Sequence, residues 1–201
     1  MAGRSKPVIA VFDFDETLIV KDSLFDFLYY SYPLSVFIFK TMRCTPMLVL
    51  FALKRISNDA AKERLLTVFL GGASEDQFRA LCEAYKDRLD NLANEDALKC
   101  VDRHHKQGDE VVIVSASPED WIAPWAKSHD ISNVIATKLS TRKGQLTGRL
   151  ATPNCHGPEK VTRFLQVFPD RNNYILYAYG DGKSDKQMFE LADFAFEKRF
   201  E

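Results

Sequence analysis

Short apolar runs alternate with amphipathic segments along most of this chain. The strand-like runs fall at about Val8–Phe12, Glu110–Val114, Val134–Thr137, Tyr174–Tyr179 and Phe194–Phe196. The helix-like segments between them fall at about Asp96–Gln107, Pro118–Ser128, Pro158–Phe168 and Ser184–Leu191. Short apolar runs bounded by polar residues are typical of buried strands. Their alternation with helices predicts an α/β fold, a doubly wound, Rossmann-like parallel sheet. Lys138–Leu150 adds a predicted hairpin with its turn at 142–145.

About eighty residues after the first strand have a different pattern, helix-like throughout. We therefore expect an α/β core of residues 1–20 and 95–201, with a helical insertion of residues 21–94. Either Asp22 or Ser23 fits a helix N-cap in this insertion. Ser74 opens a capping-box pattern at the start of a helix to about residue 89.

Composition gives no reason to expect a nucleic-acid-binding protein or a zinc protein. The 201 residues carry a net charge of -1, which gives no electrostatic reason to expect a nucleic-acid partner. The cysteines are scattered without a C-x-x-C pair, at Cys44, Cys82, Cys100 and Cys155. Scattered thiols indicate a reduced, cytoplasmic protein and no zinc site. We do not interpret the first apolar run as a signal peptide, because cleavage after it would remove or displace the acids that follow.

Those acids, Asp13 and Asp15, stand where the first strand ends. In open α/β sheets, ligands bind at the carboxyl ends of the strands. Side chains alternate along an extended chain, so both carboxylates can face one crevice while Phe14 points elsewhere. Two converging carboxylates repel each other unless a cation lies between them.

Further polar residues follow the later strands or open the later helices. They are Ser115 after the second strand, Lys160 at a helix start, and Asp181 with Asp185 after a C-terminal strand. Ser115 can hold an anion, whereas Ser117 just before Pro118 better fits a helix cap. A lysine at a helix N-terminus opposes the helix dipole, so Lys160 is expected to have an anionic partner. We expect surface positions for His104, His105, His129 and His156, and core packing for Trp121 and Trp125. His156 is closest to a motif, which leaves open that it lines the site.

The order Asp-x-Asp-x-Thr, strand-end Ser, Lys, and Gly-Asp-x-x-x-Asp resembles the haloacid dehalogenase superfamily, from Asp13 to Asp185. The resemblance implies a phosphatase with Asp13 as nucleophile and Asp15 as general acid and base. It also implies phosphate binding by Ser115 and Lys160. The implied cofactor is Mg²⁺, held by Asp13, the backbone carbonyl of Asp15, and Asp181. Asp185 would bind the ion through water or hold the site's geometry.

The insertion resembles the helical cap of the phosphoserine-phosphatase-like branch. No acid occurs from Phe27 to Asn58, while Lys40, Arg43, Lys54 and Arg55 lie among apolar residues. A membrane span at 34–53 is disfavoured because two central cations cost about 5–7 kcal/mol. Two interpretations remain: a cap with its own small core, or a surface in peripheral contact with the inner face of an anionic membrane. We take Asp22, Lys40 and Arg43 as candidate substrate contacts.

The apolar insertion favours a lipid phosphate such as phosphatidylglycerophosphate as the phosphorylated substrate. The apolar insertion, together with the segments Cys155–Lys160 and Tyr177–Asp185, looks closest to bacterial phosphatidylglycerophosphatase C-like members. The alternative is a soluble phosphatase for phosphoserine or a similar small metabolite. From another class, the chain would be a non-catalytic phosphate-binding or membrane-docking module. The sequence leaves the oligomeric state open.

Overall fold

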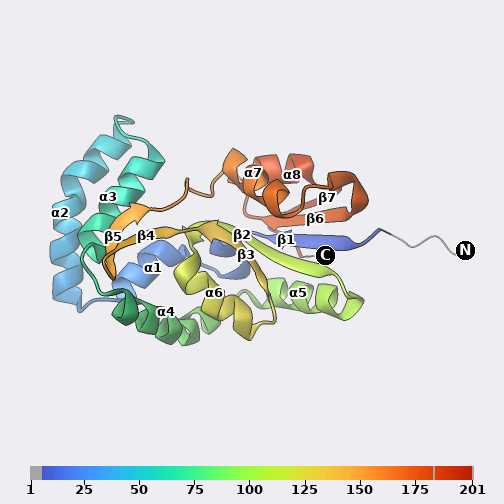
Figure 1. The fold of residues 1–201 in the computed structure, drawn as a ribbon, viewed down its shortest axis with the longest axis horizontal. Coiled ribbons are helices and arrows are strands. Elements are labelled where there is room, and N and C mark those ends of the chain that lie inside the picture. The colour runs from blue at the N-terminus through green and yellow to red at the C-terminus, as the bar shows by residue number, and fades with distance from the viewer. Residues whose placement is uncertain (1–5, 183, 201) are drawn as a thin grey trace, which may run out of the picture.

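Five parallel strands form the central sheet in the computed structural model, which describes residues 6–182 and 184–200 (Figure 1). The strands are β1 (Val8–Phe12), β2 (Glu110–Pro118), β3 (Asn133–Thr137), β6 (Ile175–Gly180) and β7 (Phe194–Glu197). Their spatial order is β3-β2-β1-β6-β7. The chain moves outward from β1 to β3, then crosses to the other side of β1 for β6 and β7. The predicted doubly wound parallel sheet is confirmed, and β1 lies where the strand order reverses.

Both faces of the sheet are apolar, which explains why its strands have continuous hydrophobic sequences. Ala10 and Phe12 of β1 pack on one side, and Ile9 and Val11 on the other. The first face is covered by α5 (Glu95–Gln107) and α6 (Glu119–Ser128), and the second by α7 (Pro158–Val167) and α8 (Lys186–Leu191) (Figure 1). Trp121 and Trp125 of α6 are fully buried, as predicted.

The chain between β1 and β2 is helical. After a short π-helical turn η1 (Phe14–Leu18) come α1 (Ser23–Tyr30), α2 (Leu34–Ala52), α3 (Asn58–Leu70) and α4 (Glu75–Asp90). Asp22 is the N-cap of α1, where Oδ1 accepts the backbone N–H of Phe25 at 3.1 Å. Ser74 is the N-cap of α4, but its side chain makes no capping hydrogen bond, so the predicted capping box is wrong in that respect.

A two-stranded hairpin, β4 (Leu139–Arg142) and β5 (Gln145–Leu150), joins this helical insertion to the core. Lys143 and Gly144 both have positive φ angles, of 53° and 74°, as a tight hairpin turn requires. Gly148 lies directly on α3, because a Cβ there would fall 2.2 Å from the Cα of Thr67. The hairpin therefore fixes α3 relative to the sheet.

The helix α2 lies at the outer edge of the molecule and packs mainly on α3 (Figure 1). Lys40 of α2 donates from Nζ to the carbonyls of Val68 and Phe69, at 2.8 and 3.0 Å. These carbonyls belong to the last turn of α3, where a cation is favourable. Lys40 thus stabilises a helix end. Nowhere in the described chain does a helix combine the length and apolar character needed to cross a membrane.

The prediction of four surface histidines is wrong for His104. Its ring is buried against the sheet, with Nδ1 2.8 Å from Asp109 Oδ2 and Nε2 3.0 Å from the Tyr179 hydroxyl. A signal existed in the sequence, because His104 shares the buried face of α5 with Ala97, Cys100 and Val101. Its neighbour in sequence, His105, points less deeply inward and is half-buried.

Candidate active site

Asp13 and Asp15 line one crevice at the carboxyl end of β1. Its volume is about 190 Å³, and its walls include Lys160 and Asp181. Asp13 and Asp15 both have extended backbone, and directly after them Glu16 has a left-handed φ of 56°. Phe14 points away from the crevice and packs edge-on against Trp125. The alternation expected from an extended strand end therefore brings both carboxylates to one place.

Lys160 links two of the acids. Its Nζ donates to Asp13 Oδ1 and to Asp185 Oδ1, each at 2.6 Å, and all three side chains are buried. Lys160 lies in the first turn of α7, whose N-terminus faces this edge of the sheet. The anionic partner expected for this lysine is thus present twice.

Burial is the main cause of the raised pKa values of the acids at this site. Burial and the nearby carboxylates of Asp185 and Asp15 raise the pKa of Asp13 against the opposing effect of the Lys160 ammonium. Burial and the charge of Asp22 raise the pKa of Asp15, while hydrogen bonds from Ser117 and Ser23 oppose the rise. Burial and Asp185 also raise the pKa of Asp181. So many acids in one crevice call for a further positive charge.

Asp13, Asp181 and Asp185 form a cluster suited to that charge. Each offers a carboxylate oxygen, and these oxygens lie within 4.8 Å of one another. Oxygen-only ligands of this kind suit Mg²⁺ and disfavour zinc. The backbone N–H of Asp181 donates to Asp185 Oδ2 at 3.2 Å and orients it. Gly180 allows this approach, since a Cβ there would fall 2.4 Å from the same oxygen.

Ser117 differs from expectation, and Ser115 is not among the described lining residues of the crevice. Ser115 is fully buried, and its hydroxyl accepts the backbone N–H of Ser117 at 3.0 Å. Ser117 was expected to cap α6, but the N-cap is Pro118, and Ser117 donates its hydroxyl to Asp15 Oδ2 at 2.5 Å. The backbone N–H of Ser23 donates to the other oxygen at 2.6 Å. Ser117 and Ser23 therefore fix the orientation of the Asp15 carboxyl group.

A second cavity, of about 260 Å³, adjoins the crevice and shares Asp15, Asp22 and Ala116 with it. Its walls are mainly apolar and come from the helical insertion: Leu24, Phe25, Met47, Phe51, Ala61 and Leu65. His156 also lines it, as the sequence had left open. Asp22 therefore lies where the crevice and this cavity meet.

Lys62 is the residue that sequence analysis missed. Its buried ammonium lies in the second cavity and donates to Ala116 O at 2.6 Å and Asn154 Oδ1 at 3.0 Å. Both partners are neutral oxygens. Burial lowers the pKa of Lys62 to about 8, although Asp15 and Asp22 act in the opposite direction. A signal existed, because Lys62 shares the apolar face of α3 with Leu65 and Phe69.

Two expected substrate contacts lie elsewhere. Lys40 is held at the end of α3, and Arg43 lines a separate groove between α2 and α3. Neither belongs to the described walls of the crevice or of the adjoining cavity. Of the three insertion residues singled out from the sequence, Asp22 alone is among the described lining residues of the crevice.

Comparison with known proteins gives consistent results. Residues 10–190 match the family of haloacid dehalogenase-like hydrolases. Protein CicA of Caulobacter vibrioides is 34% identical over 194 residues, covering 94% of this chain and 84% of that protein. A Bordetella pertussis protein of unknown function has a similar structure, with a TM-score of 0.84, 23% identity, and coverage of 96% and 90%. A phospho-aspartyl intermediate analogue of phosphoserine phosphatase superposes with a TM-score of 0.62, 16% identity, and coverage of 97% and 95%. The two structural likenesses concern the fold.

Proposed function

Because this chain belongs to the haloacid dehalogenase-like hydrolase family, we propose that it is a Mg²⁺-dependent phosphomonoesterase that works through an aspartyl-phosphate. The observation that carries the proposal is the shared crevice of Asp13 and Asp15, with Lys160 bonded to Asp13. The phosphoserine phosphatase of similar fold, captured as a phospho-aspartyl analogue, supports the same intermediate here. The helical insertion of residues 21–94 would act as the cap over this crevice.

Asp13 is the proposed nucleophile. Its carboxylate attacks phosphorus as the bond to the leaving alcohol breaks, so phosphate is transferred to Asp13. Asp15 donates a proton to the leaving oxygen, then accepts one from the water that hydrolyses the aspartyl-phosphate. A raised pKa favours the protonated form of Asp15 that the first step needs. Ser117 and Ser23 keep this carboxyl in place.

Charge on the phosphate must be offset before an anion can attack it. Lys160 supplies one fixed positive charge, with Ser115 as the expected neighbour of a phosphoryl oxygen. Asp13, Asp181, Asp185 and the Asp15 carbonyl would hold Mg²⁺, which neutralises phosphoryl oxygens when bound. Asp185 also binds Lys160, so the same residue positions the ammonium and completes the acidic cluster.

Asp181→Asn tests the metal site. Loss of one anionic ligand should raise the Mg²⁺ concentration for half-maximal activity by roughly 10–100-fold, the range seen when a metal site loses even an outer partner. Titrating activity against MgCl₂ measures this shift. Asp170→Asn is the matched control, since Asp170 is exposed and is not among the described lining residues of the crevice. An unchanged Mg²⁺ requirement in Asp181→Asn would remove Asp181 from the ligand set.

The adjoining cavity points to an amphiphilic leaving group. Its apolar walls start beside Asp15 and end at Phe25 and Phe51, which are both exposed. An apolar path therefore leads from the acid to the surface of the helical insertion. We accordingly favour a lipid phosphate, of which phosphatidylglycerophosphate is the first choice, reached by peripheral contact with an anionic membrane.

Lys62 narrows this class further. A buried cation is costly unless an anion or several hydrogen bonds compensate it. The described partners of Lys62 are neutral, and its cavity has space for a ligand. The preferred substrate should therefore carry a second anionic group near the phosphomonoester, such as a phosphodiester or a carboxylate.

Lys62→Met should lower kcat/KM for such a substrate by roughly 10–100-fold, the value of a charge-assisted hydrogen bond. Hydrolysis of p-nitrophenyl phosphate, which lacks the second anion, should change little. Steady-state kinetics on short-chain phosphatidylglycerophosphate and the aryl phosphate, with exposed Lys127→Met as control, measure the difference.

In the wild type, KM for the anionic substrate should rise above pH about 8 as Lys62 loses its proton, and Lys62→Met should lack that rise. Equal losses on both substrates would refute the assignment.

A direct comparison of phosphatidylglycerophosphate with phosphoserine tests the substrate. Faster turnover of phosphoserine would favour the small-metabolite phosphatase, which Lys62 could serve through the serine carboxylate. A phosphate-binding module without turnover would show no activity that depends on added Mg²⁺. The presence of a nucleophile, an acid and a cation in one crevice argues for catalysis.

A further inference from the structure

The outward side of α2 carries an apolar stripe. Ile38, Met42, Val49 and Leu53 recur at helical spacing, and 48%, 67%, 52% and 63% of their surfaces are exposed. Leu34 continues the stripe at the start of the helix. Side chains this apolar on one continuous face mark an interaction surface. The described buried residues of this helix that join the core are instead Cys44 and Met47.

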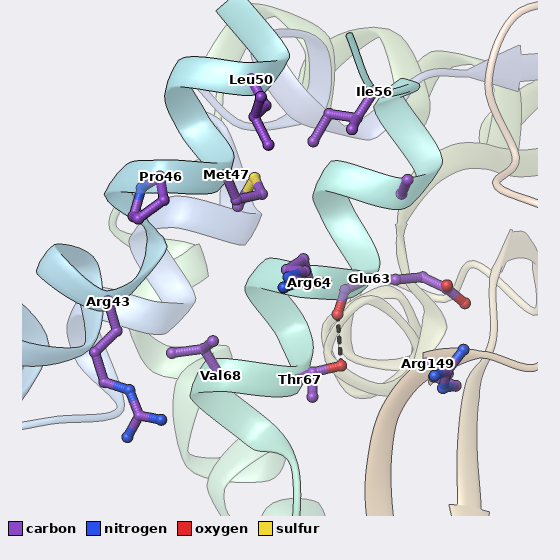
Figure 2. A pocket seen from close by; sticks show the side chains of 11 residues that line it. Arg43, Pro46, Met47, Leu50, Ile56, Glu63, Arg64, Thr67, Val68 and Arg149 are labelled. Carbon is purple, nitrogen blue, oxygen red and sulfur yellow. Dashed lines mark hydrogen bonds between the residues drawn. The ribbon is translucent and has the colours of Figure 1, made fainter.

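A groove of about 620 Å³ runs beside this stripe, between α2 and α3 (Figure 2). Pro46, Met47, Leu50 and Ile56 line its upper part. Three arginines from three elements surround it: Arg43 on α2, Arg64 on α3 and Arg149 on β5. Figure 2 shows Arg43 at one side, Arg149 at the other, and Arg64 between them.

The arginines of the groove are free to bind an anion. All three are exposed, and no described residue accepts a hydrogen bond from their guanidinium groups. Glu63 is the acid among the described lining residues, and its Oε1 already accepts the backbone N–H of Leu150 at 3.0 Å. The groove is therefore positive, with an apolar part that continues into the stripe through Leu50.

Cations next to an exposed apolar helix face match the surface of an acidic bilayer. An interfacial helix buries its apolar side at the acyl boundary while basic side chains contact anionic head groups. A second copy of the chain would meet the same three arginines with Glu63 as the one acid among the described lining residues. A protein partner would have to be both apolar and acidic.

We propose that the stripe of α2 and the arginine groove form a docking surface for acidic phospholipids, with head-group phosphates at Arg43, Arg64 and Arg149. This inference deepens the membrane contact in the proposed function and rests on it. None of the three arginines lines the crevice or its adjoining cavity, and Met47 is the one described residue that the groove and that cavity share. Binding and hydrolysis can therefore be measured independently.

Co-sedimentation with vesicles tests the surface. Wild-type protein should bind phosphatidylglycerol–phosphatidylcholine vesicles at low salt and bind pure phosphatidylcholine much less. The triple variant Arg43→Gln, Arg64→Gln, Arg149→Gln should lower the partition coefficient about fivefold per arginine, or about a hundredfold in all. The control, Lys106→Gln with Lys127→Gln and Arg199→Gln, makes the same charge change at exposed positions on other elements and should bind nearly as wild type.

A reporter on the stripe locates the contact. Met42→Trp should show a blue-shifted emission with anionic vesicles and quenching by brominated lipids. Hydrolysis of p-nitrophenyl phosphate by the triple variant should match the wild type, so a failed docking surface and a failed active site give different results. Equal vesicle binding by both triple variants, or a Met42→Trp emission that vesicles leave unchanged, would overturn the proposal. So would a stable dimer in sedimentation velocity that binds no vesicles.

Discussion

Asp13→Asn should abolish turnover while the protein remains folded. The amide keeps the shape of the carboxyl and still accepts from Lys160, which also retains Asp185. An amide oxygen does not form the aspartyl-phosphate, so kcat should fall by a factor on the order of 10⁶, as when other enzymes lose their nucleophile. Initial rates with p-nitrophenyl phosphate at saturating Mg²⁺ measure the loss, and thermal unfolding checks the fold.

Trapping the intermediate separates a missing nucleophile from a damaged site. Beryllium fluoride with Mg²⁺ should inhibit the wild type as an acyl-phosphate mimic and should not bind Asp13→Asn. Brief reaction with a ³²P-labelled substrate should label the wild type alone, at Asp13. Label found on another residue, or substantial turnover by a clean preparation of Asp13→Asn, would transfer the role of nucleophile elsewhere.

The sheet and the acidic crevice could be predicted because their signals are local. Each strand of the sheet is a short apolar run, and Asp13 and Asp15 follow the first run directly. Once β1 is buried between two strands, the acids after it can only emerge at the ligand-binding edge. Lys160 and Asp185 were expected there too, and the structure adds that they bind each other.

Several other contacts between distant segments could not be predicted. Ser117 looked like a helix cap because only Pro118 was visible beside it, whereas its partner Asp15 lies 102 residues earlier. Lys40 was expected to contact substrate, but its ammonium donates to a carbonyl in the last turn of α3. The buried ammonium of Lys62 donates to Asn154, which lies 92 residues away in sequence. Such roles depend on how the hairpin and the helical insertion meet the core.

Asp15→Asn should slow the first chemical step by about 10²–10⁴-fold, the usual contribution of general acid catalysis. The loss should be greatest for alkyl phosphates, whose leaving oxygen needs the proton, and least for p-nitrophenyl phosphate. Asparagine at this position still accepts from Ser23 and contacts Ser117, so the local structure should persist. Rapid-quench measurements of phosphate transfer to Asp13 isolate this step from hydrolysis of the intermediate.

Ser117→Ala is the matched comparison for Asp15→Asn. It removes one hydrogen bond that orients Asp15 but leaves the acid itself, so its loss should be smaller and should retain the wild-type dependence on leaving group. Steady-state rates alone are insufficient, because hydrolysis of the intermediate also needs Asp15 and slows for every substrate. A transfer step in Asp15→Asn as sensitive to the leaving group as in the wild type would mean that another group protonates the alcohol, with His156 in the adjoining cavity the next residue to replace.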